Sequence, residues 1–345
     1  MAVPGAALLE ILDRTLEGRG AGGIAVVSAA VEKTDAVWRP ASSRDEPGYL
    51  AYSITKTFIA TVMLQLRDAQ RLSLDDRLSR WFPGIDRSER ISLRQLLDHT
   101  AGIPDYGSLD SYHDAVRASP SVPWSFERFA AETFEEGLRF EPGSSWAYSN
   151  PGYMLLKRIA EELTGQSFGV LIRDRITSPL GLGRTFVAET IDDLSSLAPA
   201  ESTALSIDRT ARGVRGRYHP GWVSHGVVAS TPSEIARFLD ALFCRDLLSS
   251  PSLREMTTLV SFGAVAAAGA SRWRKPGYGL GVIGDPESAW GRLWGHNGGG
   301  PGYSTSAFHA PDAGGASVCA MCSVEGDARA EAIVFAVLDA LRRAP

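Results

Sequence analysis

The sequence has little lysine and no long apolar run. Of its 35 lysine and arginine residues, only four are lysines, at positions 33, 56, 157 and 275. No apolar stretch approaches the roughly 18 to 20 residues that cross a bilayer, so no membrane span is expected. The net charge of -5 comes from acidic and basic residues mixed along the whole chain, without a clustered basic face. This pattern argues against a role at nucleic acids or membrane surfaces.

Cysteine and metal-binding patterns are also scarce. The three cysteines, Cys244, Cys319 and Cys322, are odd in number and predict no disulfide framework. Cys319 and Cys322 spell C-x-x-C, but GGASVCAMCSV is typical of a buried strand, on which residues three apart point to opposite faces. The six histidines are scattered without ligand spacing, so neither a metal nor another cofactor is expected. The signatures G-x-S-x-G and H-E-x-x-H of other hydrolases are absent.

The first twenty residues lack the basic leader of a secretory signal and carry Glu10 and Asp13 among leucines. They predict an amphipathic helix instead. Its apolar face holds Leu8, Leu9, Leu12 and Leu16. The sequence as given is therefore expected to be cytoplasmic.

The hydrophobic pattern places strands near both ends of the chain. Two are predicted at the start, from Gly23 to Val31 and from Asp35 to Ala41, and a helix follows from about Ser53 to Leu66. The last third contains four short runs rich in β-formers: YGLGVIG, AWGRLWGH, YSTSAFHA and ASVCAMCSV. A final helix is predicted from about Ala328 to Arg342. Thr231-Pro232-Ser233-Glu234 marks another helix start, where the glutamate can close a capping box.

This order predicts an α+β fold, with an antiparallel sheet built from both termini, flanked by helices, plus a mostly helical lobe. The predicted sheet domain is discontinuous, 1–70 with 225–345, and the helical domain is 71–224. The active site is expected between them. Helices predicted in the middle segment are Ser92–Asp98, Phe126–Glu136 and Gly152–Leu163. Aromatic residues of the same segment are candidates for pocket walls, core or surface: Tyr106, Tyr112, Trp124, Tyr218 and Trp222.

The first chemical motif is Ser53-Ile54-Thr55-Lys56, at the start of an apolar helix. The spacing puts Ser53 and Lys56 on one helical face. Helix N-terminal amides favour an alkoxide or oxyanion, and a desolvated lysine can become a base, which arginine cannot. In a chain so rich in arginine, a lysine here indicates such a base. The alternative is a capping serine beside a solvated lysine.

Two further motifs lie in glycine-rich segments. Tyr148-Ser149-Asn150 offers a phenol that can shuttle protons near an ammonium and an amide that can orient the lysine or the substrate. The alternative is a surface tyrosine beside a turn. His296-Asn297-Gly298-Gly299 follows a strand, and its glycines permit close backbone approach and N–H groups aimed at an oxyanion. The alternative there is a β-turn with His296 facing solvent.

The order S-x-x-K, Y-x-N, H-x-G, with spacings of about 95 and 145 residues, resembles the serine β-lactamase and penicillin-binding protein superfamily. The likeness is greatest to its class C β-lactamase-like branch, which includes the family VIII carboxylesterases. It extends from about Leu50 to Ser306. Other segments that resemble the family include ISLRQLLDHTAGIPDY, FEPGSSWAYSNPGYMLLKRIAEELTGQSF and GVVASTPSEIARFL.

The resemblance implies that Ser53 attacks a carbonyl and that Lys56 or Tyr148 takes its proton. The backbone N–H groups of Ser53 and Gly299 would form the oxyanion hole, next to Gly298. Tyr148 would then help protonate the leaving group and activate the incoming acceptor. Asn150 would line the site.

His296 occupies the position where class C β-lactamases carry a lysine. Histidine is mostly neutral at pH 7 and cannot hold a substrate carboxylate as a permanent cation does, so efficient β-lactam hydrolysis is not expected. Cell-wall transpeptidases work outside the membrane, and the sequence as given shows no export signal.

The leading hypothesis is a serine hydrolase that forms an acyl-enzyme with small esters or amides, most simply a β-lactamase-like carboxylesterase. One alternative is a transacylase of secondary metabolism, amide- or ester-forming, that uses the same Ser, Lys and Tyr. Another is a non-catalytic scaffold or sensor. Substrate identity and oligomeric state stay open.

Overall fold

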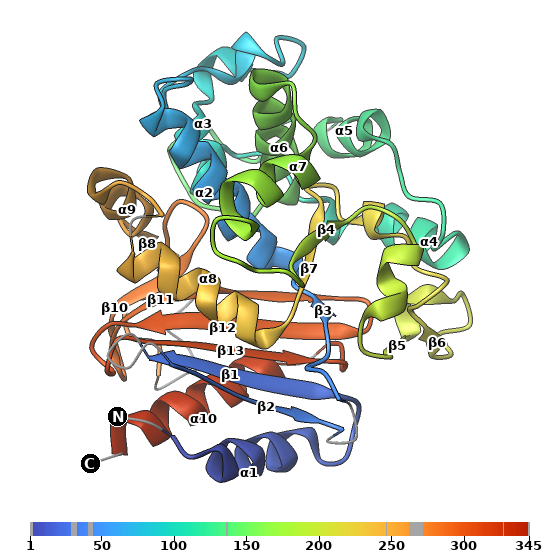
Figure 1. Ribbon diagram of the computed structural model, residues 1–345. Coiled ribbons are helices and arrows are strands. Elements are labelled where there is room, and N and C mark those ends of the chain that lie inside the picture. Colours follow the sequence, from blue (N-terminus) through green and yellow to red (C-terminus); the bar gives the residue numbers. More distant parts are fainter. Residues whose placement is uncertain are drawn as a thin grey trace.

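The computed structural model describes residues 3–28, 33–40, 44–135, 137–245, 247–261, 272–326 and 328–343. Its centre is an eight-stranded antiparallel sheet in the order β2-β1-β13-β12-β11-β10-β9-β8 (Figure 1). The strands are β1 (Gly22–Ser28), β2 (Lys33–Arg39), β8 (Val260–Ser261), β9 (Gly277–Tyr278), β10 (Ile283–Ser288), β11 (Gly291–Gly300), β12 (Tyr303–Ala310) and β13 (Ala316–Cys322). Two small sheets are formed by β3 (Tyr49–Leu50), β7 (Val227–Ser230) and β4 (Phe186–Ala188), and by β5 (Glu201–Ser202) and β6 (Arg212–Gly213).

The large sheet joins the two ends of the chain. β1 lies beside β13, with Ile24 opposite Ala320 in an antiparallel register. This pairing confirms the predicted antiparallel sheet built from both termini and flanked by helices. Side chains of β1 alternate between the faces: Ile24 belongs to one buried apolar cluster and Ala25 to the other.

Helices cover both faces of the sheet. α1 and α10 pack on one face, while α8 lies across β1, β12 and β13 on the other (Figure 1). The remaining helices continue beyond α8, away from the sheet. The helices are α1 (Gly5–Leu16), α2 (Thr55–Asp68), α3 (Leu93–Leu97), α4 (Asp110–Ala118), α5 (Phe126–Phe134), α6 (Asn150–Thr164), α7 (Phe168–Ile172), α8 (Pro232–Cys244), α9 (Ser250–Met256) and α10 (Arg329–Arg343).

The C-x-x-C pair has the expected structural role. Cys319 and Cys322 are buried thiols on β13, and they belong to the two apolar clusters on opposite faces of the sheet. The period of two along a strand separates them, so they cannot share a metal or a disulfide.

The helix start at Thr231 differs from the prediction in one respect. The Thr231 hydroxyl accepts from the N–H of Glu234, as a capping residue should. The Glu234 carboxylate does not close the capping box. It accepts instead from the Arg184 N–H and the Thr185 hydroxyl, which fixes the segment before β4 to α8.

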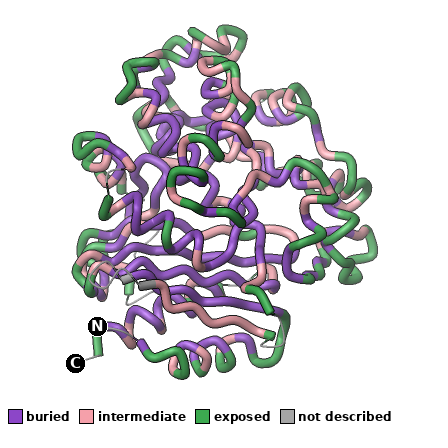
Figure 2. The backbone as a smooth tube through the Cα atoms, viewed as in Figure 1, coloured by how far each residue is buried: buried purple, intermediate pink, exposed green. Residues whose placement is uncertain are grey.

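α2 is buried along almost its whole length, and purple backbone runs through it and the central strands in Figure 2. It begins at Thr55, two residues later than predicted, because Tyr52–Ile54 forms a 3₁₀ turn. Ser53 therefore sits in the turn that leads into the helix. Among the residues that the structure describes, no helix has the length and apolar character needed to cross a membrane.

Candidate active site

Ser53 is held at the base of a cavity by the backbone before it. Tyr52 has a φ of 44°, in the left-handed region that non-glycine residues rarely adopt. Its hydroxyl donates to the Pro301 carbonyl at 2.6 Å, and its ring fills the space where a Cβ on Gly300 would stand. A strained residue kept in place by tertiary contacts is common next to a functional group.

Lys56 lies one helical turn beyond Ser53 and is fully buried. Its Nζ is 3.3 Å from Ser53 Oγ, 2.7 Å from Asn150 Oδ1 and 3.2 Å from His225 Nε2. Burial lowers the pKa of Lys56 from 10.5 to about 7, and the charge of Asp105 opposes this shift. A neutral amine there would donate to Asn150 and His225 and keep its lone pair for the Ser53 hydroxyl.

Asp105 fixes the orientation of Asn150. The Asp105 carboxylate accepts from the Asn150 Nδ2 at 3.0 and 3.2 Å and from its backbone N–H at 3.1 Å. A carboxylate can only accept, so the amide oxygen of Asn150 must face Lys56. Asn150 thus contacts the lysine, which fits one of the two roles that its place in the Y-x-N motif left open.

Tyr148 reaches Ser53 from the other side. Its hydroxyl donates to Ser53 Oγ at 2.8 Å, and Lys56 Nζ lies 4.8 Å from its ring centroid. Burial raises the pKa of Tyr148, so it keeps its proton at neutral pH. The ring of His99 packs against it at 4.4 Å between centroids, and His99 Nδ1 accepts from the Ser149 N–H.

His296 is buried, and its environment keeps it neutral. Burial lowers the pKa of His296 to about 3, with the charge of Lys56 acting in the same direction. Its Nδ1 is 2.5 Å from the Asn297 carbonyl, which can only accept, so Nδ1 carries the proton. Nε2 then accepts from the Tyr278 hydroxyl at 2.8 Å. The alternative of a β-turn with His296 facing solvent is therefore wrong, and both ring nitrogens of His296 form hydrogen bonds within the protein.

The glycines of β11 bring backbone close to the nucleophile. A Cβ on Gly298 would lie 2.3 Å from the Ala51 carbonyl and 3.1 Å from the Ser53 nitrogen, so only glycine fits. Gly299 faces open space, with nothing within 4 Å of such an atom. The predicted glycine cluster thus forms the end of β11, and this end runs alongside Ser53.

The active-site cavity, of about 720 Å³, opens in front of these groups. Ser53, Asn150, Gly298 and Gly299 line it, whereas Lys56, Tyr148 and His296 are outside its lining. Its other lining residues include three of the aromatic candidates and two charged side chains: Tyr106, Tyr112, Tyr218, Arg117 and Glu325. Arg117 contacts Asp114, and Glu325 accepts from the N–H groups of Gly302 and Thr203.

Sequence reasoning missed three residues of the site. His99 and Asp105 lie in the segment ISLRQLLDHTAGIPDY, which resembles the family, but no spacing there or around His225 indicates a chemical role. Folding brings His225 to Lys56 from a segment 169 positions away. Burial lowers the pKa of His225, and its Nδ1 is buried without a hydrogen-bond partner among the described residues.

An antiparallel sheet flanked by helices, with a serine, a buried lysine and a tyrosine in contact beside its strand β11, defines the β-lactamase-like class of proteins. The chain belongs to the Beta-lactamase family, whose model matches residues 3–340.

Relatives with known roles are similar over much of the chain. Penicillin-binding protein 4* of Bacillus subtilis is 30% identical over 269 residues, which cover 73% of this chain and 56% of that protein. The D-alanyl-D-alanine-carboxypeptidase/endopeptidase AmpH of Escherichia coli is 26% identical over 60% of this chain and 52% of that protein. The chain spans about half the length of such relatives.

Solved structures resemble the whole chain. A D-stereospecific amidohydrolase from Streptomyces has a TM-score of 0.84 and 29% identity, covering 97% of this chain and 98% of that one. The D-amino acid amidase of Ochrobactrum anthropi has a TM-score of 0.82 at 22% identity, covering 98% and 99% of the two chains. The proteins similar to this chain thus include a carboxypeptidase/endopeptidase and a D-stereospecific amidohydrolase, while the likeness to the D-amino acid amidase bears on the fold alone.

Proposed function

We propose that this chain hydrolyses small amides and esters through an acyl-enzyme on Ser53. One observation carries the proposal: a fully buried Lys56, with its pKa lowered to about 7, contacts the Ser53 hydroxyl at 3.3 Å. A neutral amine at this place can accept the hydroxyl proton, which activates the serine.

Lys56 is the general base of the proposed mechanism, because Tyr148 keeps its proton at neutral pH. As Ser53 Oγ bonds to the substrate carbonyl carbon, its proton passes to Lys56 Nζ. The N–H groups of Ser53 and Gly299 stabilise the negative oxygen. When the tetrahedral intermediate collapses, Tyr148 gives its proton to the leaving nitrogen or oxygen and regains one from Lys56. Water then cleaves the acyl-enzyme by the reverse proton transfers.

Both amide and ester cleavage are proposed, including the carboxylesterase activity that the motifs suggest. The whole-chain similarity to a D-stereospecific amidohydrolase supports amides of D-amino acids among the substrates. A neutral His296 offers no fixed cation for a substrate carboxylate, which favours amides and esters over acidic β-lactams.

Intact-protein mass spectrometry tests the acyl-enzyme. A fluorophosphonate and a p-nitrophenyl ester should each add one group to the protein and none to Ser53→Ala. Ser108→Ala is the matched control, because Ser108 is an exposed serine next to Gly107 of the active-site cavity and should leave labelling intact. An adduct that persists in Ser53→Ala would contradict the proposal.

Turnover of D- and L-phenylalanine amide and of a p-nitrophenyl ester tests the substrates. Hydrolysis of the ester with neither amide would restrict the activity to esters. If Ser53 is labelled but none of these three compounds is turned over, the proposed substrate class is wrong, while Ser53 is still the nucleophile.

A further inference from the structure

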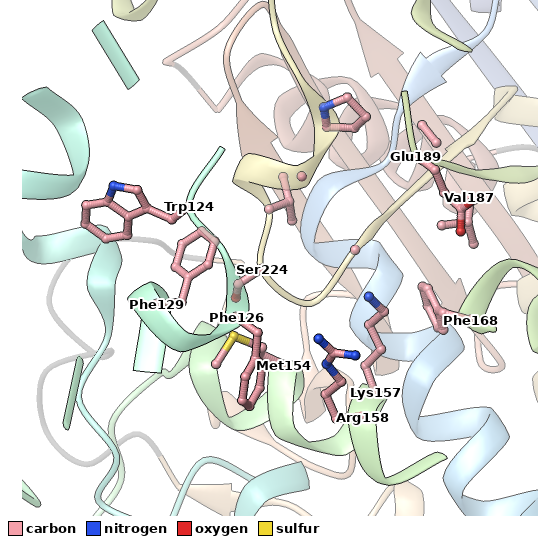
Figure 3. A pocket seen from close by; sticks show the side chains of 15 residues that line it. Trp124, Phe126, Phe129, Met154, Lys157, Arg158, Phe168, Val187, Glu189 and Ser224 are labelled. Carbon is pink, nitrogen blue, oxygen red and sulfur yellow. The ribbon is translucent and has the colours of Figure 1, made fainter. Parts of the chain in front are cut away.

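A second cavity of about 300 Å³ lies on the other side of the segment that carries His225. It is bordered by residues of α5, α6, α7, β4 and the segment from Pro220 to Gly226, whose side chains Figure 3 draws as sticks. Its volume is at the lower end of the range for small-molecule pockets, roughly 300 to 1,000 Å³. The proposed acyl-enzyme chemistry makes no use of it.

The walls of the second cavity combine apolar rings with two cations. Phe126, Phe129 and Phe168 supply the rings. Lys157 and Arg158 extend from α6 next to each other, between Phe168 on one side and Phe126 on the other (Figure 3). An apolar wall with a few convergent polar groups is the usual character of a ligand site.

Lys157 lies near two carboxylates without a hydrogen bond to either among the described residues. Its side chain is only 25% exposed, and burial is the main reason that its pKa is lowered. The charge of Arg158 adds to this effect, whereas the charges of Glu161 and Glu189 oppose it. Glu161 is its ion-pair partner at 3.8 Å, and the same carboxylate lies 3.9 Å from Arg158 and accepts from the Phe168 N–H. No described residue accepts a hydrogen bond from Lys157 Nζ, although Glu189 also lines the cavity.

Ser224 and Glu189 complete the polar part of this wall. The Ser224 hydroxyl oxygen is buried beside the Tyr106 hydroxyl, which accepts from the Ser224 N–H at 3.2 Å and also interacts with the Ser224 side chain. A hydroxyl proton rotates to suit its acceptor, so Ser224 can also donate to a ligand in the second cavity.

We propose that the second cavity binds a small organic carboxylate. Its carboxylate is held by Lys157 and Arg158 and accepts from the Ser224 hydroxyl, and its apolar body lies against the phenylalanine rings. Charged hydrogen bonds to a carboxylate are shorter and stronger than neutral ones, so an ion at this place would satisfy donors that Glu161 reaches only at 3.8 Å or more.

The position of the cavity links it to the catalytic lysine. Val223 lines both cavities, Ser224 lines the second, and His225 lines the active-site cavity, 3.2 Å from Lys56. The charge of Lys157 is among the causes that lower the pKa of His225. A bound anion would thus lie against the segment that carries His225, which contacts Lys56.

Isothermal titration calorimetry with butyrate, isovalerate, benzoate and phenylacetate tests the site, with benzamide as the neutral counterpart of benzoate. At least one acid should bind saturably with one molecule per chain, and benzamide should bind roughly tenfold or more weakly than benzoate. Lys157→Met and Arg158→Met should each weaken the acid roughly tenfold or more. Lys275→Met is the matched control, because Lys275 is 64% exposed and pairs with Glu287, and it should bind as the parent does.

Arg158→Met keeps the test decisive should Lys157→Met fail to fold, since the Arg158 side chain is half exposed. The proposal is overturned if no acid binds, if benzamide binds as well as benzoate, or if both folded variants bind as the parent does. The last result would place the acid in the active-site cavity, which neither residue lines. The measurement needs no turnover, so it is independent of the proposed hydrolase.

Discussion

Acylation of Ser53 should accelerate with rising pH and level off above about 7. Lys56 must lose a proton before it can accept the one from Ser53, and burial lowers its pKa from 10.5 to about 7. At about 1.4 kcal/mol for each pH unit, this shift corresponds to about 5 kcal/mol against the charged form. At pH 7 about half the molecules would hold a neutral amine, compared with roughly one in 3,000 for an unshifted lysine.

The assay is kcat/KM for a p-nitrophenyl ester between pH 5 and 9. Well below pH 7, kcat/KM should fall about tenfold for each pH unit, which is the slope expected when one essential base becomes protonated. Lys56→Arg should abolish this limb and lower kcat/KM by roughly 10² to 10⁴, because a guanidinium keeps its proton throughout the range. A flat profile in the parent protein, or near-normal activity in Lys56→Arg, would refute the role of Lys56 as the base.

Three further predictions concern residues around Lys56 and Ser53. Asp105→Asn removes the charge that raises the pKa of Lys56, so the acidic limb of the kcat/KM profile should move to lower pH. The plateau of the profile should fall as well, because Asp105 also holds Asn150 against Lys56. An acidic limb that stays in place would contradict this prediction. His225→Ala should let water reach the ammonium, raise the Lys56 pKa and move the limb to higher pH in the same assay, whereas an unchanged limb would show that water does not enter. Gly298→Ala should lose activity and roughly 1 to 3 kcal/mol of stability in urea unfolding, while Gly299→Ala, which meets open space, should stay stable; equal stability of the two would refute the close approach at Gly298.

The part of the site that sequence could predict consists of groups with fixed local spacing. Ser53 and Lys56 are one turn apart, and Tyr148 and Asn150 belong to one short loop, so each pair could be recognised before the fold was known. The predicted antiparallel sheet followed in the same way from apolar runs with a period of two. These signals are local, and the structure brings all four residues into contact.

The missing part depends on contacts between distant segments. His225 and Asp105 act on Lys56 through tertiary contacts, and no spacing in the chain distinguishes them from ordinary polar residues. The sequence predicted a mostly neutral His296, but its tautomer depends on the Asn297 carbonyl and the Tyr278 hydroxyl. The division into domains 1–70 with 225–345 and 71–224 stays a prediction.

The hydrogen bond from the Tyr52 hydroxyl to the Pro301 carbonyl limits where this protein can be engineered. The tip of a hairpin is normally a tolerant place for inserted residues or grafted peptides. Here the tip between β11 and β12 anchors the residue that precedes the nucleophile, and its Gly302 N–H is also tied to Glu325. An insertion at Pro301 would displace Ser53, so a grafted loop belongs elsewhere, such as the exposed segment 207–213.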